Sequence, residues 1–165
     1  MAFDQNKGTQ TGRSFAVAPF RIDTLQSYLA GDWNLKRVIH QVGEGRKATF
    51  NASASFVPDE KSPTDTFIYS EEGLLETGDE KFDATRTYIY TFIGSALAEV
   101  RFADGTFFHV LDLSAGLLRV EHHCADDFYQ GLFRAIDFNT WLSVWRIDGP
   151  RKKQVISTHY LRANN

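Results

Sequence analysis

About ten short runs of β-forming residues follow one another along this chain, with turn-forming residues between them. The runs cover residues 35–42, 48–56, 66–71, 85–92, 98–102, 107–113, 118–124, 129–136, 141–147 and 154–161. The fifth and sixth runs are joined by Asp104-Gly105, a strong hairpin signal. Short strands at a spacing of roughly 8–15 residues are typical of an all-β barrel or sandwich.

Several of these runs carry aromatic or apolar residues on both faces. Tyr88 and Tyr90 share one face of their run and Ile89 takes the other, while Trp141 lies opposite Leu142. A sandwich with one solvated face would alternate more cleanly between apolar and polar residues. The sequence therefore predicts a single closed or nearly closed antiparallel barrel of 8–10 strands, whose lining mixes polar and aromatic groups.

The segment before the first strand predicts how one end of the barrel is closed. Residues 21–30 place apolar side chains at helical spacing, and Gly31 favours the end of that helix. In lipocalins and their calycin relatives, a Gly-x-Trp occurs where the first strand enters the barrel. We therefore expect a short N-terminal helix to cap one end and Trp33 to plug it. In lipocalin-like barrels an arginine of the last strand packs across that indole, a role that falls to Arg162 here.

Composition limits the classes of partner. The chain has 165 residues, a net charge of -3 and one cysteine, so it reads as one domain without an internal disulfide. No basic field favours nucleic acid or an anionic membrane, and no apolar run spans a bilayer. We expect a cytoplasmic monomer or weak homodimer, because no secretory signal is visible. Residues 1–19 are polar and aperiodic and predict a flexible tail, with the barrel domain at 20–165.

Polar residues within the predicted strands are the candidate binding residues. If their faces point inward, Glu71 and Arg86 would be paired charges among tyrosines and histidines. His109 would share its face with Phe107 and Leu111. The candidate cavity residues are Tyr69, Glu71, Arg86, Tyr88, Tyr90, His109, His122, Cys124, Tyr129 and Tyr160. The simpler alternative is that the histidines are hydrogen-bonded core or surface residues and that Cys124 is an inert thiol.

Metal and nucleophile sites can be tested by spacing. His122, His123 and Cys124 are consecutive, but neighbours on a strand point to opposite faces, so at most two can reach one metal. Paired Cys or His ligands at the gaps of structural zinc sites do not occur. No Gly-x-Ser-x-Gly, phosphate-binding loop or His-Glu-x-x-His is present. We expect no metal and no cofactor, with haem held by one inward histidine as the open alternative.

Seven runs carry a resemblance to a known family: residues 31–37, 69–73, 86–90, 102–109, 122–131, 145–152 and 158–162. From Trp33 to Arg162 the chain resembles a domain-of-unknown-function family with a lipocalin-like barrel. The resemblance covers about four fifths of the chain and implies a calycin-type fold. It implies no activity, and the analogy to lipocalins and fatty-acid-binding proteins suggests a ligand carrier by association only.

Three functions compete on these grounds. The leading hypothesis is an intracellular protein that binds, without catalysis, a small and partly apolar molecule with an anionic or hydrogen-bonding group. Arg86 would supply the positive charge, and tyrosines the walls of the cavity. The alternative is a lyase, isomerase or hydrolase in the same cavity, with His122 or His109 as general base and Glu71 or Tyr129 as its partner. A third possibility is an interaction module whose barrel is filled by its own side chains.

Overall fold

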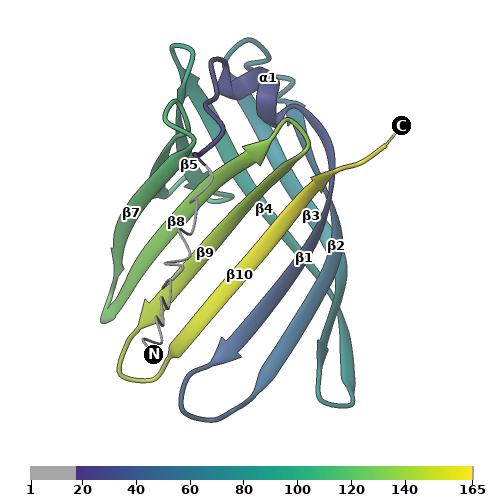
Figure 1. Cartoon of the computed structure of the whole chain (residues 1–165), viewed down its shortest axis with the longest axis vertical. Coiled ribbons are helices and arrows are strands. Elements are labelled where there is room, and N and C mark those ends of the chain that lie inside the picture. The colour runs from purple at the N-terminus through teal and green to yellow at the C-terminus, as the bar shows by residue number, and fades with distance from the viewer. Residues whose placement is uncertain (1–17, 165) are drawn as a thin grey trace, which may run out of the picture.

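The computed structural model describes residues 18–164, so residues 1–17 of the predicted tail lie outside the described part. The barrel follows directly on one short helix (Figure 1). In chain order the elements are α1 (Leu25–Leu29), β1 (Gly31–Gln41), β2 (Lys47–Pro58), β3 (Thr66–Thr77), β4 (Glu80–Ile93), β5 (Leu97–Phe102), β6 (Phe107–Asp112), β7 (Leu117–Cys124), β8 (Asp127–Asp137), β9 (Thr140–Asp148) and β10 (Lys153–Arg162).

The ten strands form one antiparallel sheet that curls into a nearly closed barrel, which confirms the predicted fold class (Figure 1). Every strand pairs with its neighbours in sequence except at one place, between β6 and β7. The first and last strands pair instead, from Trp33 opposite Arg162 to Gln41 opposite Gln154. The barrel is thus closed by its two terminal strands and keeps one seam without ladder hydrogen bonds, between β6 and β7.

The helix is shorter than the predicted span of residues 21–30. It begins after Thr24, whose side chain makes no capping hydrogen bond, and covers five residues. Its leucines are fully buried, and the Tyr28 hydroxyl donates to the backbone carbonyl of Asp137 at 2.9 Å. An isolated helix of this length is unstable in water, so its packing against the barrel end holds it in place. Figure 1 shows α1 across one end of the barrel.

The third predicted run, residues 66–71, is too short, because β3 passes through Gly73 and continues to Thr77. A Cβ atom on Gly73 would lie 2.2 Å from the backbone oxygen of Asn51 and 2.5 Å from the Cα of Ala52. Glycine is required here by the close approach of β2, and it does not mark a turn. The chain turns instead at Gly78, whose φ of +58° suits a glycine.

A β-bulge changes which side chains of β6 face inward. The register between β5 and β6 shifts at this point, and Phe108 becomes an extra residue on β6. Phe108 and His109 are consequently both buried, whereas Phe107 is 45% exposed. The prediction that His109 shares a face with Leu111 agrees with the burial of both side chains, but the inclusion of Phe107 on that face is wrong.

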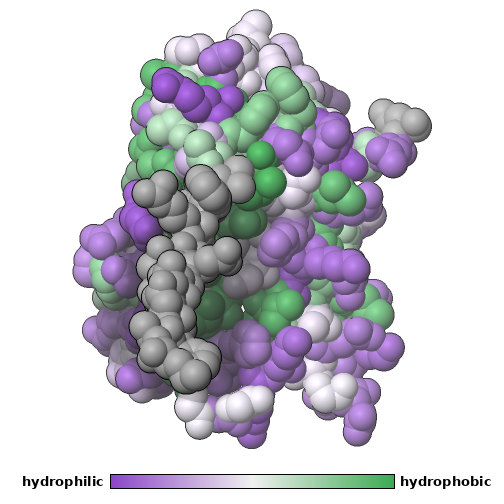
Figure 2. Space-filling view, viewed as in Figure 1, coloured by the Kyte–Doolittle hydropathy of each residue, from purple (hydrophilic) through white to green (hydrophobic). Residues whose placement is uncertain are grey.

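The two ends of the barrel differ in content. Near α1 the interior is filled by apolar side chains, among them Leu25, Leu29, Trp33, Leu111 and Leu113. In the view of Figure 2, hydrophobic side chains gather toward the end that carries α1, and hydrophilic ones cover much of the other end. Among the described residues, no helix has both the length and the apolar character needed to cross a bilayer.

Candidate ligand-binding site

The end of the barrel beneath α1 is sealed by Trp33. Its side chain is fully buried, and its indole N–H donates to the backbone carbonyl of Leu29 at 2.8 Å. The guanidinium carbon of Arg162 lies 4.2 Å from the centre of the Trp33 ring, which is a cation–π distance. Opposite positions of β1 and β10 bring these two residues together.

The remaining contacts of Arg162 are with backbone carbonyls. One terminal nitrogen donates to Ala30 at 2.9 Å, and the other donates to Tyr28 at 2.6 Å and to Phe138 at 3.2 Å. These carbonyls belong to the helix end and to the β8–β9 turn. Arg162 therefore ties three segments together at the closed end and has a structural role there.

Below this plug lies a cavity of about 590 Å³. It reaches the turns at the opposite end of the barrel, where Asp104, Cys124 and Lys152 line it. Nine of the ten candidate residues line the cavity: Tyr69, Arg86, Tyr88, Tyr90, His109, His122, Cys124, Tyr129 and Tyr160. Glu71 does not line it but contacts three residues that do, Arg37, Tyr69 and Arg86. The structure thus brings the predicted set together around one space.

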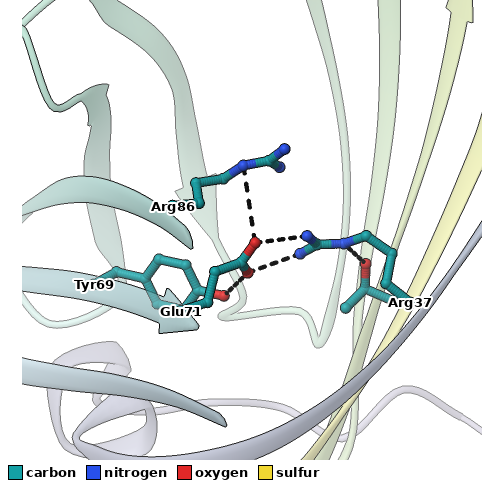
Figure 3. A network of polar contacts seen from close by, with 5 residues as sticks. Arg37, Tyr69, Glu71 and Arg86 are labelled. Atoms are coloured by element: carbon teal, nitrogen blue, oxygen red, sulfur yellow. Dashed lines mark hydrogen bonds and ion pairs between the residues drawn. The ribbon is translucent and has the colours of Figure 1, made fainter. Parts of the chain in front are cut away.

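Glu71 is held mainly by an arginine that the sequence analysis did not single out. Both carboxylate oxygens accept hydrogen bonds from Arg37, at 2.6 Å and 2.8 Å, so the pair is bidentate (Figure 3). The hydroxyl of Tyr69 donates to Glu71 at 2.5 Å. The Nε of Arg37 donates to the hydroxyl of Thr158 at 2.9 Å. Figure 3 shows the carboxylate of Glu71 between Arg37, Tyr69 and Arg86.

Arg86 takes a secondary place in this cluster. Its Nε lies 3.8 Å from the nearer Glu71 oxygen, and its side chain is 47% exposed, against 2% for that of Glu71. The predicted pairing of Glu71 with Arg86 is therefore only a weak ion pair, because Arg37 makes the two short contacts. Arg86 makes no hydrogen bond with any other residue in the described part of the chain.

The electrostatics keep Glu71 ionised. Burial alone would raise the pKa of its carboxyl, but the hydrogen bonds and charge of Arg37 hold that pKa below its usual value. Burial raises the pKa of Tyr69 well above its ordinary value, and neighbouring Tyr160 and Glu71 raise it further. Glu71 is consequently a hydrogen-bonded anion and a poor proton acceptor at neutral pH.

Arg37 could have been predicted from the sequence. Trp33 was expected to point into the barrel, and side chains two and four positions further along a strand point the same way. Leu35 and Arg37 follow this alternation, and both are buried. Phe108 carried no such signal, because the bulge that turns it inward depends on how β5 and β6 pair.

Near-parallel aromatic rings form part of the cavity wall. Phe108 lies 5.0 Å from Trp145 with planes 17° apart, and 5.7 Å from Tyr88 with planes 22° apart. Gly131 makes room for Trp145, since a Cβ atom there would lie 2.8 Å from the indole. These rings come from three separate strands and present flat apolar surfaces to the cavity.

The two cavity histidines differ in their surroundings. His109 is 4% exposed and packs against the rings of Phe108, Phe133 and Trp145. Burial lowers its pKa to about 4, so the ring is neutral at pH 7. His122 is half-buried on β7, with Phe108 and Tyr129 as ring neighbours.

Within the described residues, neither cavity histidine is hydrogen-bonded to Glu71 or Tyr129, the partners named by the enzymatic alternative. The Nδ1 of His109 lies 3.0 Å from the backbone oxygen of Val110, and within residues 18–164 no carboxylate is hydrogen-bonded to His109 or His122. In the same part of the chain, no group of three or more His, Cys, Asp or Glu side chains could hold a metal ion. Cys124 is an exposed thiol at the cavity rim.

The cavity has more positive than negative groups, although the protein carries a net charge of -3. Arg37, Arg86 and Lys152 line it together with Asp104, and Glu71 lies just behind. Asp104 already accepts hydrogen bonds from the backbone N–H and the hydroxyl of Thr106 in its own turn. The charged groups around this cavity are therefore positive on balance.

Two solved structures share the fold. An S-type phycobiliprotein lyase from Guillardia theta matches with a TM-score of 0.59 and 8% identity, over 85% of this chain and 91% of that one. A protein of unknown function from the DUF3598 family of Nostoc punctiforme matches with a TM-score of 0.61 and 12% identity. That match covers 92% of this chain and 53% of the other, so this chain spans about half its length. At such identities the likeness concerns the fold alone.

The sequence comparisons settle the family. No curated protein matches this chain in sequence. The model of the family of unknown function DUF6314 matches residues 29–162, from the end of α1 to the last residue of β10. The match takes in the plug, the Glu71 cluster and every strand of the barrel. The chain therefore belongs to the DUF6314 family.

Proposed function

We propose that this protein binds, without catalysis, a small and partly apolar molecule that carries an anionic group, and that the molecule occupies the barrel cavity. The proposal rests on the unequal distances between the Glu71 carboxylate and its two neighbouring arginines. Arg37 makes both short contacts with the carboxylate, at 2.6 Å and 2.8 Å, and Arg86 lies 3.8 Å away. Arg86 is left with a positive charge that no carboxylate fully compensates, and it lines the cavity.

The rest of the lining suits an apolar body. The rings of Tyr88, Phe108 and Trp145 supply flat surfaces, and a cavity of about 590 Å³ is within the usual range for small-molecule sites. Such a guest would bury its apolar part against the rings and keep its charge near Arg86. Stacking on rings and a charge-assisted hydrogen bond together supply affinity and orientation.

Catalysis is the weaker candidate for this cavity. The fold likeness to a phycobiliprotein lyase, at 8% identity, does not carry an activity across. Glu71 is committed to Arg37 with a lowered pKa, and burial lowers the pKa of His109 to about 4. A general base works best when its pKa lies near the working pH, which neither group satisfies.

The proposal is tested with matched pairs of ligands. Calorimetric titrations compare 2-naphthoate with 2-naphthamide, and a medium-chain fatty acid with its amide. We expect the carboxylate of at least one pair to bind about tenfold more tightly than its amide, as one charge-assisted hydrogen bond allows. Arg86→Gln should remove this preference and leave the thermal midpoint nearly unchanged, because Arg86 is half exposed.

The control is Arg119→Gln, which removes an exposed arginine that does not line the cavity. It should leave every affinity as in the wild type. The proposal is contradicted if no carboxylate binds more tightly than its amide. It is also contradicted if Arg119→Gln weakens binding as much as Arg86→Gln does.

A further inference from the structure

His109 lines the cavity and has one ring nitrogen, Nε2, without a hydrogen-bond partner among the described residues. The β-bulge on β6 places it inside the barrel next to Phe108, and it lines the cavity with 4% of its surface exposed. Its surroundings are the rings of Phe108, Phe133 and Trp145, at centroid distances of 4.7 Å, 5.0 Å and 5.4 Å. A polar atom in such an apolar setting gains strongly from a hydrogen-bonding partner.

The geometry fixes which nitrogen carries the proton. Nδ1 lies 3.0 Å from the backbone oxygen of Val110, and a carbonyl oxygen only accepts hydrogen bonds. Nδ1 therefore holds the proton, and Nε2 is left with a lone pair that accepts. Burial keeps the ring neutral, since it lowers the pKa of His109 to about 4. Within residues 18–164, Nε2 has no hydrogen-bond donor.

We propose that Nε2 of His109 accepts a hydrogen bond from the ligand, and that the ligand is a flat, apolar anion bearing a hydroxyl or N–H donor. This inference rests on the proposed function, because it assumes that the anionic group is held near Arg86. It adds a second polar contact on β6, separated from Arg86 on β4 by the rings of Tyr88 and Phe108. Hydroxy- or amino-substituted aromatic acids are the ligand class that fits both contacts.

We expect the site to distinguish ligands with a donor from ligands without one, because a hydrogen-bond acceptor that is left unpaired on binding costs free energy. A ligand without a donor covers Nε2 and excludes water from it without replacing the hydrogen bond. Sites of this kind reject analogues that lack the donor more strongly than a purely apolar pocket rejects a change of one methyl group. His109 would thus be a specificity-determining residue, and the bulge that places it inside would be part of the site.

The test uses positional isomers so that one of them reaches Nε2. The 5-, 6- and 7-hydroxy-2-naphthoates are titrated by calorimetry against the wild-type protein, each beside its methyl ether and beside 2-naphthoate. We expect at least one hydroxy compound to bind about tenfold or more tightly than both its methyl ether and 2-naphthoate. The methyl ether has the same connectivity but no donor, so the comparison isolates the hydrogen bond.

Substitutions then test whether His109 is responsible for the preference for the hydroxy compound. His109→Phe should abolish the preference and leave the affinity for 2-naphthoate within about threefold, because an aromatic ring still fills the wall. His109→Gln should keep part of the preference, since its amide oxygen accepts a hydrogen bond near the Nε2 position. His159→Phe, the same change at an exposed histidine that does not line the cavity, should keep the preference in full.

A spectroscopic measurement reads the hydrogen bond directly. With ¹⁵N-labelled histidine, the wild-type protein should show a pyridine-type Nε2 resonance that His109→Phe removes. That resonance should move upfield when the preferred hydroxynaphthoate binds and stay in place with its methyl ether. A purely structural role of His109 would leave it unmoved by both compounds.

The outcomes separate this inference from the proposed function. If no naphthoate isomer is preferred over its methyl ether, or if His159→Phe removes the preference as fully as His109→Phe does, the role of His109 is overturned. In either case a carboxylate preference that depends on Arg86 would leave the proposed function standing. If the carboxylate preference itself is missing, the proposed function fails, and this inference fails with it.

Discussion

The closed end of the barrel and the cavity wall each hold an arginine, and they neutralise its charge in different ways. At the closed end, Arg162 lies over the ring of Trp33 and donates to the backbone carbonyls of Ala30, Tyr28 and Phe138. In the cavity wall, Arg37 makes a bidentate pair with Glu71. The first arrangement uses neutral partners fixed by the fold, and the second uses a charge that the neighbouring Arg86 also contacts.

This difference indicates how each end responds to change. Backbone carbonyl oxygens do not titrate, so we expect the contacts at the closed end to contribute to stability and not to binding. The Glu71 cluster concentrates two cations and one anion beside a cavity, so its balance bears on both stability and binding. Three predictions test this division, beginning with the largest expected effect.

Glu71→Gln should lower the free energy of unfolding by about 3–5 kcal/mol, because it leaves the buried guanidinium of Arg37 without its counter-charge. Urea unfolding followed by circular dichroism measures the change. Replacing both partners, in the double variant Arg37→Met with Glu71→Leu, should recover more than half of the loss. Asp148→Asn, which breaks the exposed pair with Arg146, should leave the free energy of unfolding nearly unchanged. Equal losses at the two sites would refute the assignment of Glu71 as a buried charged partner.

Arg162→Leu should cost about 2–3 kcal/mol of unfolding free energy, since backbone carbonyls at the closed end lose their donors and Trp33 loses its cation–π contact. Naphthoate affinity should stay within about twofold, because Arg162 does not line the cavity. The unfolding free energy of Arg162→Lys should lie between those of the wild type and Arg162→Leu, because one ammonium group cannot reach all these acceptors. A loss of affinity without a loss of stability would reverse the roles given to the two ends.

The smallest predicted effect is a loss of folding stability at acidic pH. The pKa of His109 is about 4 in the folded protein and 6.5 when the chain is unfolded, so the unfolded state binds the proton first as pH falls. Stability that is fully present above about pH 6.5 is lost as the pH falls toward about pH 4. The part that falls between about pH 7 and pH 5 amounts to about 2 kcal/mol. Urea unfolding at both pH values should show this loss.

Histidine variants provide the comparison for the acid effect. His109→Phe should reduce the pH dependence of the unfolding free energy, whereas His159→Gln, at an exposed position, should leave that dependence unchanged. A wild-type stability that stays constant over this range would contradict a neutral, buried His109. The pKa of Glu71 is lowered from its ordinary value of 4.5, so this carboxyl titrates below the range of the measurement.

Much of the site followed from alternation along the strands. Two-residue periodicity places Tyr88 with Arg86, and Cys124 with His122, and all four line the cavity. The same rule applied from Trp33 reaches Arg37 as well. It fails at β6, where the bulge shifts Phe107 outward and Phe108 inward, because a bulge depends on how two strands pair and leaves no mark on the periodicity of one of them.

The sequence by itself determined the ten strands, most of the turns between them and the presence of a helix before Gly31, because each depends on residues that are close together along the chain. Only the tertiary structure decided which charges meet. Arg37 and Glu71 are 34 positions apart, and Arg86, the predicted partner of Glu71, lies directly opposite it on β4 yet makes the longer contact. The tertiary structure also decided that β1 closes on β10 and that the seam falls between β6 and β7. Ion pairing and barrel closure depend on the curvature of the whole sheet, which no single segment of the sequence specifies.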